Sequence, residues 1–123
     1  MDDIVYISKI LNIPIVLDIH HHNCNNKNCI QYYLKDVLES WNLDIPKFHF
    51  STPKNKTKKE FRSHNDYINV DEFINFLEIV KIYNKDIDIM LEAKAKDEAL
   101  FKLVRLLKYK TNYNFIDETT FIV

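Results

Sequence analysis

Three short apolar runs, each followed by an amphipathic helical pattern, limit the folds that are open to this chain. The runs are "IPIVLDI" (13–19), "KFHFS" (47–51) and "DIDIMLEA" (86–93), and the helical patterns cover 29–41, 69–80 and 97–109. Short continuous apolar runs are typical of strands that are buried on both faces of a sheet. Strand followed by helix, three times over, predicts an α/β fold in which parallel βαβ units share one sheet. We expect a single domain over residues 1–123.

The two ends of the chain carry weaker patterns. The opening "DDIVYISKILN" is interpreted as the end of an earlier helix, and "TNYNFIDETTFIV" (111–123) contains no motif. In the second helical pattern, Asn69 with Glu72 three residues later forms a capping-box sequence, which predicts that a helix begins there. The long connection 51–69 is of a length that is uncommon unless the segment serves a function.

Glycine is absent from the chain, which excludes every glycine-rich phosphate-binding loop. Turns that need a positive φ must then use another residue, and asparagine tolerates that conformation best. We expect this role at Asn65, at Asn84, at Asn112 and at the asparagines of 23–28.

Composition also limits the setting in which the protein works. The net charge of −1 gives no whole-protein sign of nucleic-acid binding. No apolar run approaches the length of about 18 residues that a membrane span needs, and two cysteines do not make a secreted disulfide framework. We therefore predict an intracellular protein that is not secreted, with no membrane partner. A chain rich in lysine, isoleucine and asparagine suggests an AT-rich genome, as in a low-GC bacterium or a large DNA virus.

Residues that bind metal ions occur where each predicted strand ends. Asp18 and His21 close the first run, His49 lies in the second, and Glu92 lies near the end of the third. The carboxyl ends of parallel strands meet at one edge of a sheet, and α/β proteins build their sites there. Imidazole and carboxylate ligands together suit Zn²⁺, Mn²⁺ or Fe²⁺. The sequence therefore predicts a metal site at this edge of the sheet.

Four segments in series resemble the C-terminal half of the UV damage endonucleases, the UvdE family. They are "DIHHHNC", "PKFHFSTPK", "RSHNDYI" and "DIMLEAKAKDEAL", and the similarity runs from about residue 13 to about residue 107. The resemblance implies a partial TIM (β/α) barrel, of which this chain would form about the last three strand–helix units. It implies a metal-dependent DNA repair endonuclease that nicks UV-damaged double-stranded DNA 5′ to the photoproduct, a hydrolysis assisted by clustered cations.

The resemblance also implies roles for single residues. The metal ligands are expected to be Asp18, His21, His49, His64 and Glu92, with Mn²⁺ as the expected metal and Zn²⁺ or Mg²⁺ as alternatives. Lys47, two residues before one of these histidines, is expected to line the site as a catalytic residue. Further residues expected to support the ligands or to contact DNA are His20, His22, Lys54, Arg62 and Lys94.

Three alternatives remain open from the sequence. A complete TIM barrel needs eight strands and about 250 residues, so this chain is read as a split gene, a remnant or an expression fragment that is inactive alone. A separate chain would then supply the N-terminal barrel half. Another metal-dependent TIM-barrel enzyme, such as a sugar isomerase, and a non-catalytic fragment are the competing functions. Cys24 and Cys29 could also form a zinc knuckle with the histidines, although reduced thiols are the default.

Overall fold

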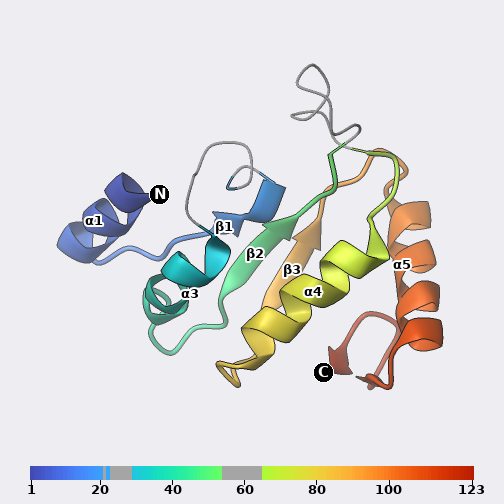
Figure 1. The fold of residues 1–123 in the computed structure, drawn as a ribbon. Helices are drawn as coiled ribbons and strands as arrows, with labels where there is room; N and C mark the ends of the chain where they lie inside the picture. Colours follow the sequence, from blue (N-terminus) through green and yellow to red (C-terminus); the bar gives the residue numbers. More distant parts are fainter. Residues whose placement is uncertain (21, 23–28, 54–64) are drawn as a thin grey trace. The chain divides into compact units, whose positions relative to one another are not determined.

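The computed structural model describes residues 1–20, 22, 29–53 and 65–123 (Figure 1). The chain forms two compact units, which are described separately. The first unit comprises Met1–Phe50 with Lys85–Met90, and the second comprises Ser51–Asn84 with Leu91–Val123. The expectation of a single domain stays a prediction. In the described residues, no helix is long and apolar enough to span a membrane.

The first unit is built on a three-stranded sheet in the order β1-β2-β3, with strands β1 (Leu17–Asp18), β2 (Lys47–Phe50) and β3 (Asp88–Leu91). The three arrows point the same way in Figure 1, and β1 pairs with β2 in parallel, Leu17 opposite Phe48 and Asp18 opposite His49. This confirms the predicted α/β fold with parallel strands.

Burial alternates along the strands, as the two-residue period of a β-strand requires. Phe48 and Phe50 of β2 are buried, whereas Lys47 is exposed and His49 is half-buried. The parallel register puts Leu17 on the face of Phe48 and Asp18 on the face of His49. One face of the sheet therefore carries apolar side chains, and the other carries the polar residues singled out in the sequence.

Helices α1 (Asp2–Leu11) and α3 (Ile30–Glu39) are the longer helices among the described residues of the first unit. Helix α3 buries an apolar stripe made of Tyr33, Leu34, Val37 and Leu38. Helix α1 confirms the helix expected at the opening, and it ends at Asn12 with a left-handed φ of 54°.

The first predicted strand is shorter than expected, and its backbone hydrogen bonds explain why. The prediction covered 13–19, but β1 contains only Leu17 and Asp18. The N–H of Ile15 donates to Ser40 Oγ, and its carbonyl accepts from Trp41 Nε1 at 2.7 Å. Side chains at the end of α3 thus occupy the backbone groups that a longer strand would use. The other two strands are shorter by one residue or more at their ends, at 47–50 and 88–91.

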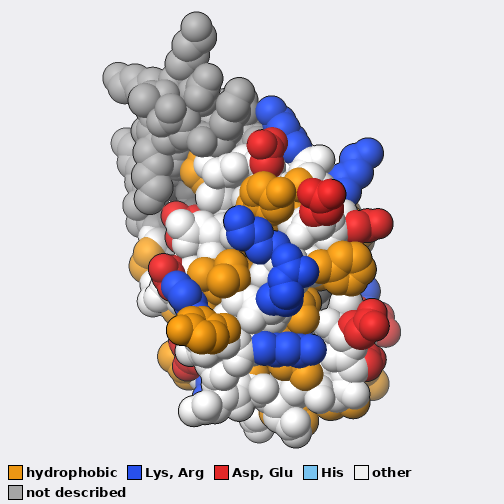
Figure 2. Space-filling model, turned by 90° about the vertical axis from the view of Figure 1, so that its right-hand side faces the viewer, with side chains coloured by type: hydrophobic (Ala, Val, Ile, Leu, Met, Phe, Trp, Pro, Cys, Tyr) orange, Lys and Arg blue, Asp and Glu red, His pale blue; other side chains and the backbone are white. Residues whose placement is uncertain are grey.

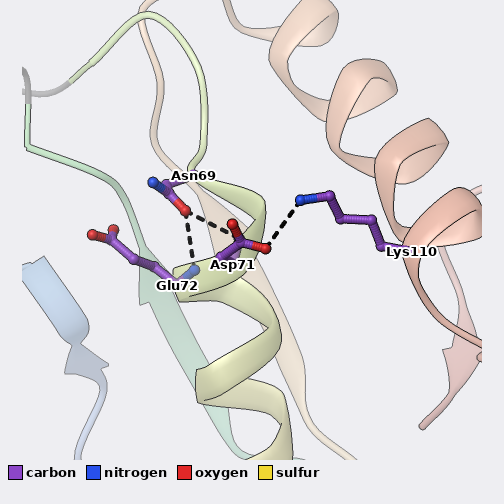
Figure 3. Close-up of polar contacts among 4 residues, drawn as sticks. All are labelled: Asn69, Asp71, Glu72 and Lys110. Atoms are coloured by element: carbon purple, nitrogen blue, oxygen red, sulfur yellow. Dashed lines mark hydrogen bonds and ion pairs between the residues drawn. The ribbon is translucent and has the colours of Figure 1, made fainter.

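The second unit packs α4 (Val70–Lys81) against α5 (Asp97–Lys110). Asn69 caps α4 as predicted, since its side-chain oxygen accepts from the N–H groups of Asp71 and Glu72 at 3.0 and 3.1 Å (Figure 3). In the same figure Lys110 of α5 donates to the Asp71 carboxylate at 3.1 Å. The N–H of Asn69 itself donates to Thr52 Oγ1. The cap therefore also anchors the end of the long connection 51–69.

A short antiparallel hairpin, which the sequence did not predict, follows α5. It consists of β4 (Asn114–Phe115) and β5 (Phe121–Ile122), and Phe115 stacks on Phe121. The outer side of α5 is charged, with Lys102, Arg105 and Lys108 exposed. Figure 2 shows lysine and arginine side chains among apolar ones on the side where α5 lies in Figure 1.

Candidate metal centre

The pairing of β1 with β2 brings together the first two predicted ligands. Asp18 and His49 are opposite each other in the parallel register, and Asp18 Oδ2 lies 3.9 Å from His49 Nδ1. This distance is too long for a hydrogen bond. Two ligand atoms that each lie about 2.1 Å from one cation can be separated by up to about 4.2 Å. The pair is therefore spaced as two ligands of a single ion would be.

The third strand carries the remaining ligand of the described residues. The N–H of Asp88 donates to the carbonyl of Pro46 at 2.9 Å, and Lys47 Nζ lies 2.6 Å from Asp88 Oδ2. These contacts align the starts of β2 and β3 with Lys47 and Asp88 on the same face. Alternation along β3 then puts Met90 and Glu92 on that face as well.

Asp18, His49 and Glu92 form a group that could hold a metal ion. Each offers one ligand atom, and these atoms all lie within 4.8 Å of one another. All three residues are half-buried, so the group is neither fully exposed to solvent nor enclosed in the core. The 4.8 Å limit is slightly longer than the separation of about 4.2 Å that two ligands of one ion can have, and the rotation of one side chain could remove this difference. The donor set, one imidazole and two carboxylates, is one that Zn²⁺ and Mn²⁺ accept.

Backbone hydrogen bonds organise the segment that follows Glu92. The N–H groups of Lys94 and Ala95 donate to the carbonyls of Asn65 and Asp66 at 3.1 and 3.0 Å. Asn65 in turn donates to the carbonyl of Thr52 at 2.8 Å. Sequence reasoning missed this arrangement, because asparagine and threonine in a loop give no periodic signal. Its effect is to fix the chain on both sides of 54–64.

Lys47 lies on the same strand face as His49 but at the opposite end of β2. Two residues along a strand correspond to about 6.6 Å. The Lys47 ammonium forms an ion pair with Asp88, and both side chains are about half exposed. No role was predicted for Asp88 from the sequence. The alternation of both strands was the signal that could have paired it with Lys47.

The other predicted residues fall into three groups. His20 and His22 are buried, and the His22 ring meets the Tyr33 ring edge-on at 5.7 Å, so neither lies at the surface. Lys94 and Cys29 are exposed. The predictions that lie outside the described residues concern His21, Cys24, Lys54, Arg62 and His64.

Comparisons with known proteins identify relatives of the chain as a whole. The family model described as "UV-endonuclease UvdE" matches residues 1–120. The UV DNA damage endonuclease of Bacillus cereus (strain B4264) is 42% identical over 96 residues, which is 76% of this chain and 30% of that protein. The enzyme of the same name from Bacillus anthracis (strain A0248) is 39% identical over 98 residues, 77% of this chain and 30% of that protein.

A solved structure shows the same fold. The crystal structure of SacUVDE matches with a TM-score of 0.71 and 30% sequence identity, over 88% of this chain and 35% of that one. The chain thus spans about a third of the length of the relatives that it matches, as a partial barrel would. With 120 residues matched to one family model, the chain belongs to the UV-endonuclease UvdE family.

Proposed function

We propose that this chain carries part of the cation-binding and phosphodiester-cutting site of a UV damage endonuclease. The observation that carries the proposal is the group of Asp18, His49 and Glu92, whose ligand atoms lie within 4.8 Å of one another. The names of the relatives supply the substrate class, since they are UV DNA damage endonucleases. The proposed substrate is therefore double-stranded DNA that contains UV photoproducts.

The proposed cation is divalent, with Mn²⁺ preferred and Zn²⁺ or Mg²⁺ as alternatives. When bound, it would supply positive charge and Lewis acidity to the scissile phosphodiester. The two carboxylates, Asp18 and Glu92, would offset the charge of the ion, and His49 contributes a neutral nitrogen that makes the donor set softer than oxygen alone. Such a mixed set favours Mn²⁺ or Zn²⁺ over Mg²⁺, which prefers oxygen ligands and bound water.

Three protein ligands would be enough for a catalytic Zn²⁺, but they are fewer than the six positions of an octahedral Mn²⁺ or Mg²⁺. Zn²⁺ takes four, and catalytic zinc sites take three from the protein. Mn²⁺ and Mg²⁺ are octahedral. His21 and His64 are proposed as further ligands, and the part of the barrel that this chain does not span would provide others. We therefore propose that the chain has part of the site and does not cut DNA alone.

Lys47 is proposed to act on the phosphate rather than on the cation. Its ammonium is held by Asp88 at 2.6 Å, on the strand face that also carries His49. A lysine held by one carboxylate keeps donors for a second anion, because its ammonium has three N–H groups. The proposed role is to bind a phosphate oxygen of the DNA strand. Damaged bases stack poorly and are less costly to expose, which would favour lesions over intact DNA.

A chimera tests the proposal. The matching 96-residue segment of the Bacillus cereus (strain B4264) relative is replaced by the corresponding residues of this chain, and nicking of UV-irradiated supercoiled plasmid is measured with Mn²⁺. We expect nicking of irradiated plasmid and none of unirradiated plasmid. His49→Ala should abolish it, whereas Glu98→Ala, an exposed acid on α5, should leave it unchanged. A folded chimera that does not nick, or that nicks equally well with His49→Ala, would overturn the proposal.

A further inference from the structure

Helix α1 leaves most of its side chains exposed, the apolar ones as well as the charged ones. Among its residues only Ser8 is buried, and the Ser8 hydroxyl donates to the carbonyl of Ile13. On the side of the helix toward α3, Lys9 forms an ion pair with Asp36 of that helix at 3.1 Å. The contacts that hold α1 in the first unit are thus largely polar. Among the apolar residues of α1 only Val5 is partly covered, and so is Met1, which precedes the helix.

The opposite side of α1 is apolar and exposed. We call it the outward face of α1, and it consists of Ile4, Tyr6, Ile7, Ile10 and Leu11, each between 47% and 67% exposed. At 100° per residue these side chains lie within an arc of about 160° around the helix, in which Asp3 is the one charged residue. The apolar surface continues along the chain, since Ile13 and Val16 are 47% and 48% exposed. Val16 directly precedes β1, an edge strand of the described sheet.

Helix α5 differs from α1, because most of its apolar stripe is buried. The exposed side of α5 carries Lys102, Arg105 and Lys108 together with the aromatic residues Phe101 and Tyr109, whereas Leu103 and Leu107 are buried. A contiguous exposed apolar surface usually marks a place where another polypeptide binds. An amphipathic helix gains most of its stability by burying its apolar stripe, so the outward face of α1 lacks the cover that α5 has.

We propose that the outward face of α1 binds the part of a UvdE-type barrel that this chain does not span. The chain covers 30% to 35% of the length of its relatives, and the family match begins at residue 1, so α1 lies inside the family's fold. The described sheet has two edge strands, β1 and β3, and the apolar residues that follow α1 lead to the β1 edge. A polypeptide that extends the sheet at β1 would cover the outward face of α1 as well. This inference rests on the proposed partial-barrel function.

The test measures association without DNA or metal. The probe is a polypeptide that contains the residues of the Bacillus cereus (strain B4264) relative outside its 96-residue match. Binding of this chain to the probe is measured by sedimentation velocity and by calorimetry. We expect a one-to-one complex, weakened at least tenfold by Ile10→Asp. The matched control is Ile82→Asp, because Ile82 is 79% exposed at the end of α4 and should leave binding unchanged.

Each outcome decides the inference. Ile10 is already 62% exposed, so Ile10→Asp should keep the circular dichroism spectrum of the parent chain, and Tyr6→Asp serves as a second variant if it does not. Equal binding by both variants and the parent would overturn the inference. The chain could instead form no complex with the probe but self-associate, with Ile10→Asp abolishing the self-association. A second copy of the chain would then be the occupant of the outward face of α1, and the inference would be overturned. A complex that forms as expected but does not nick DNA would contradict the proposed function and leave this interface standing.

Discussion

Replacement of Glu92 by alanine tests whether the sheet edge holds a cation. The substitution removes one of three ligand atoms that lie within 4.8 Å of one another and leaves Asp18 and His49 at their 3.9 Å spacing. Loss of a residue that merely supports a metal ligand lowers affinity about 10- to 100-fold. Loss of a ligand should exceed this range. We therefore expect Mn²⁺ affinity to fall at least about 100-fold, which corresponds to about 2.7 kcal/mol.

The assay is a titration of the chain with Mn²⁺, in which free Mn²⁺ is followed by electron paramagnetic resonance. Glu98→Ala is the matched control, because it removes an exposed carboxylate in the first turn of α5 that is not part of the group. Asp18→Ala should weaken binding as much as Glu92→Ala does, since both carboxylates offset the charge of the same ion. Cys24→Ser should have no effect, and loss of metal in that variant would favour a zinc knuckle instead. Mn²⁺ binding that Glu92→Ala leaves within threefold of the parent would refute the assignment.

Three further predictions concern the surroundings of the site and the fold. Lys47→Ala should leave Mn²⁺ affinity unchanged but reduce nicking by the chimera at least tenfold, whereas Asp88→Asn should reduce nicking less; a parallel loss of Mn²⁺ affinity would make Lys47 a ligand. Asn69→Ala removes two capping hydrogen bonds and should lower the free energy of unfolding in urea by about 1 kcal/mol, while Asn69→Ser should keep most of it; equal losses would argue against the cap. Burial, followed by the hydrogen bond to Glu78, raises the pKa of Tyr113 above its usual 10.0, so stability present below pH 10 should decline as the pH rises further. Tyr113→Phe should flatten that decline, and an unchanged slope in urea titrations would contradict it.

The strand positions of the site could be predicted because two simple regularities coincide there. Alternation along β2 separates Phe48 from His49, and the carboxyl ends of parallel strands share an edge. Those rules are enough to bring Asp18, His49 and Glu92 together. They do not give the lengths of strands, because the backbone groups of Ile15 are used by side chains from α3, far along the chain.

Turns were harder to predict than strands. Among the described residues, positive φ occurs at Asn12, Asn42, Asn84 and Lys96. The prediction that asparagine would take this conformation is confirmed at Asn84 and wrong at Asn112, and it did not name Asn12 or Asn42. Lys96, with φ of 51°, has no side chain that favours this conformation, so local sequence could not indicate it. Lys96 is the residue before α5, so its φ is set by the position of that helix and not by its own side chain.

The C-terminal hairpin was missed for a related reason. Strands of two residues have no period to detect, and its stability comes from stacked rings and from a turn. The Asp117 carboxylate accepts from the N–H groups of Thr119 and Thr120 at 2.9 and 2.8 Å. These hydrogen bonds, that from Thr119 first, lower the pKa of Asp117 below its usual value. An aspartate followed by two threonines was the available signal, and it predicts a turn but not the strands on either side.

The arrangement of the ligands explains why metal binding and DNA cutting should separate in this chain. The described ligands come from the ends of β1, β2 and β3, so a sheet of three strands is sufficient to assemble them. Cutting a phosphodiester also requires that the attacking and leaving oxygens be held in line, which needs charges on both sides of the phosphate. Under the proposed function, a chain that spans about a third of the length of its relatives would provide one side of such a site. Under the same proposal, the exposed apolar face of α1 and an incomplete ligand set would have one cause, because the polypeptide that covers the first would also complete the second.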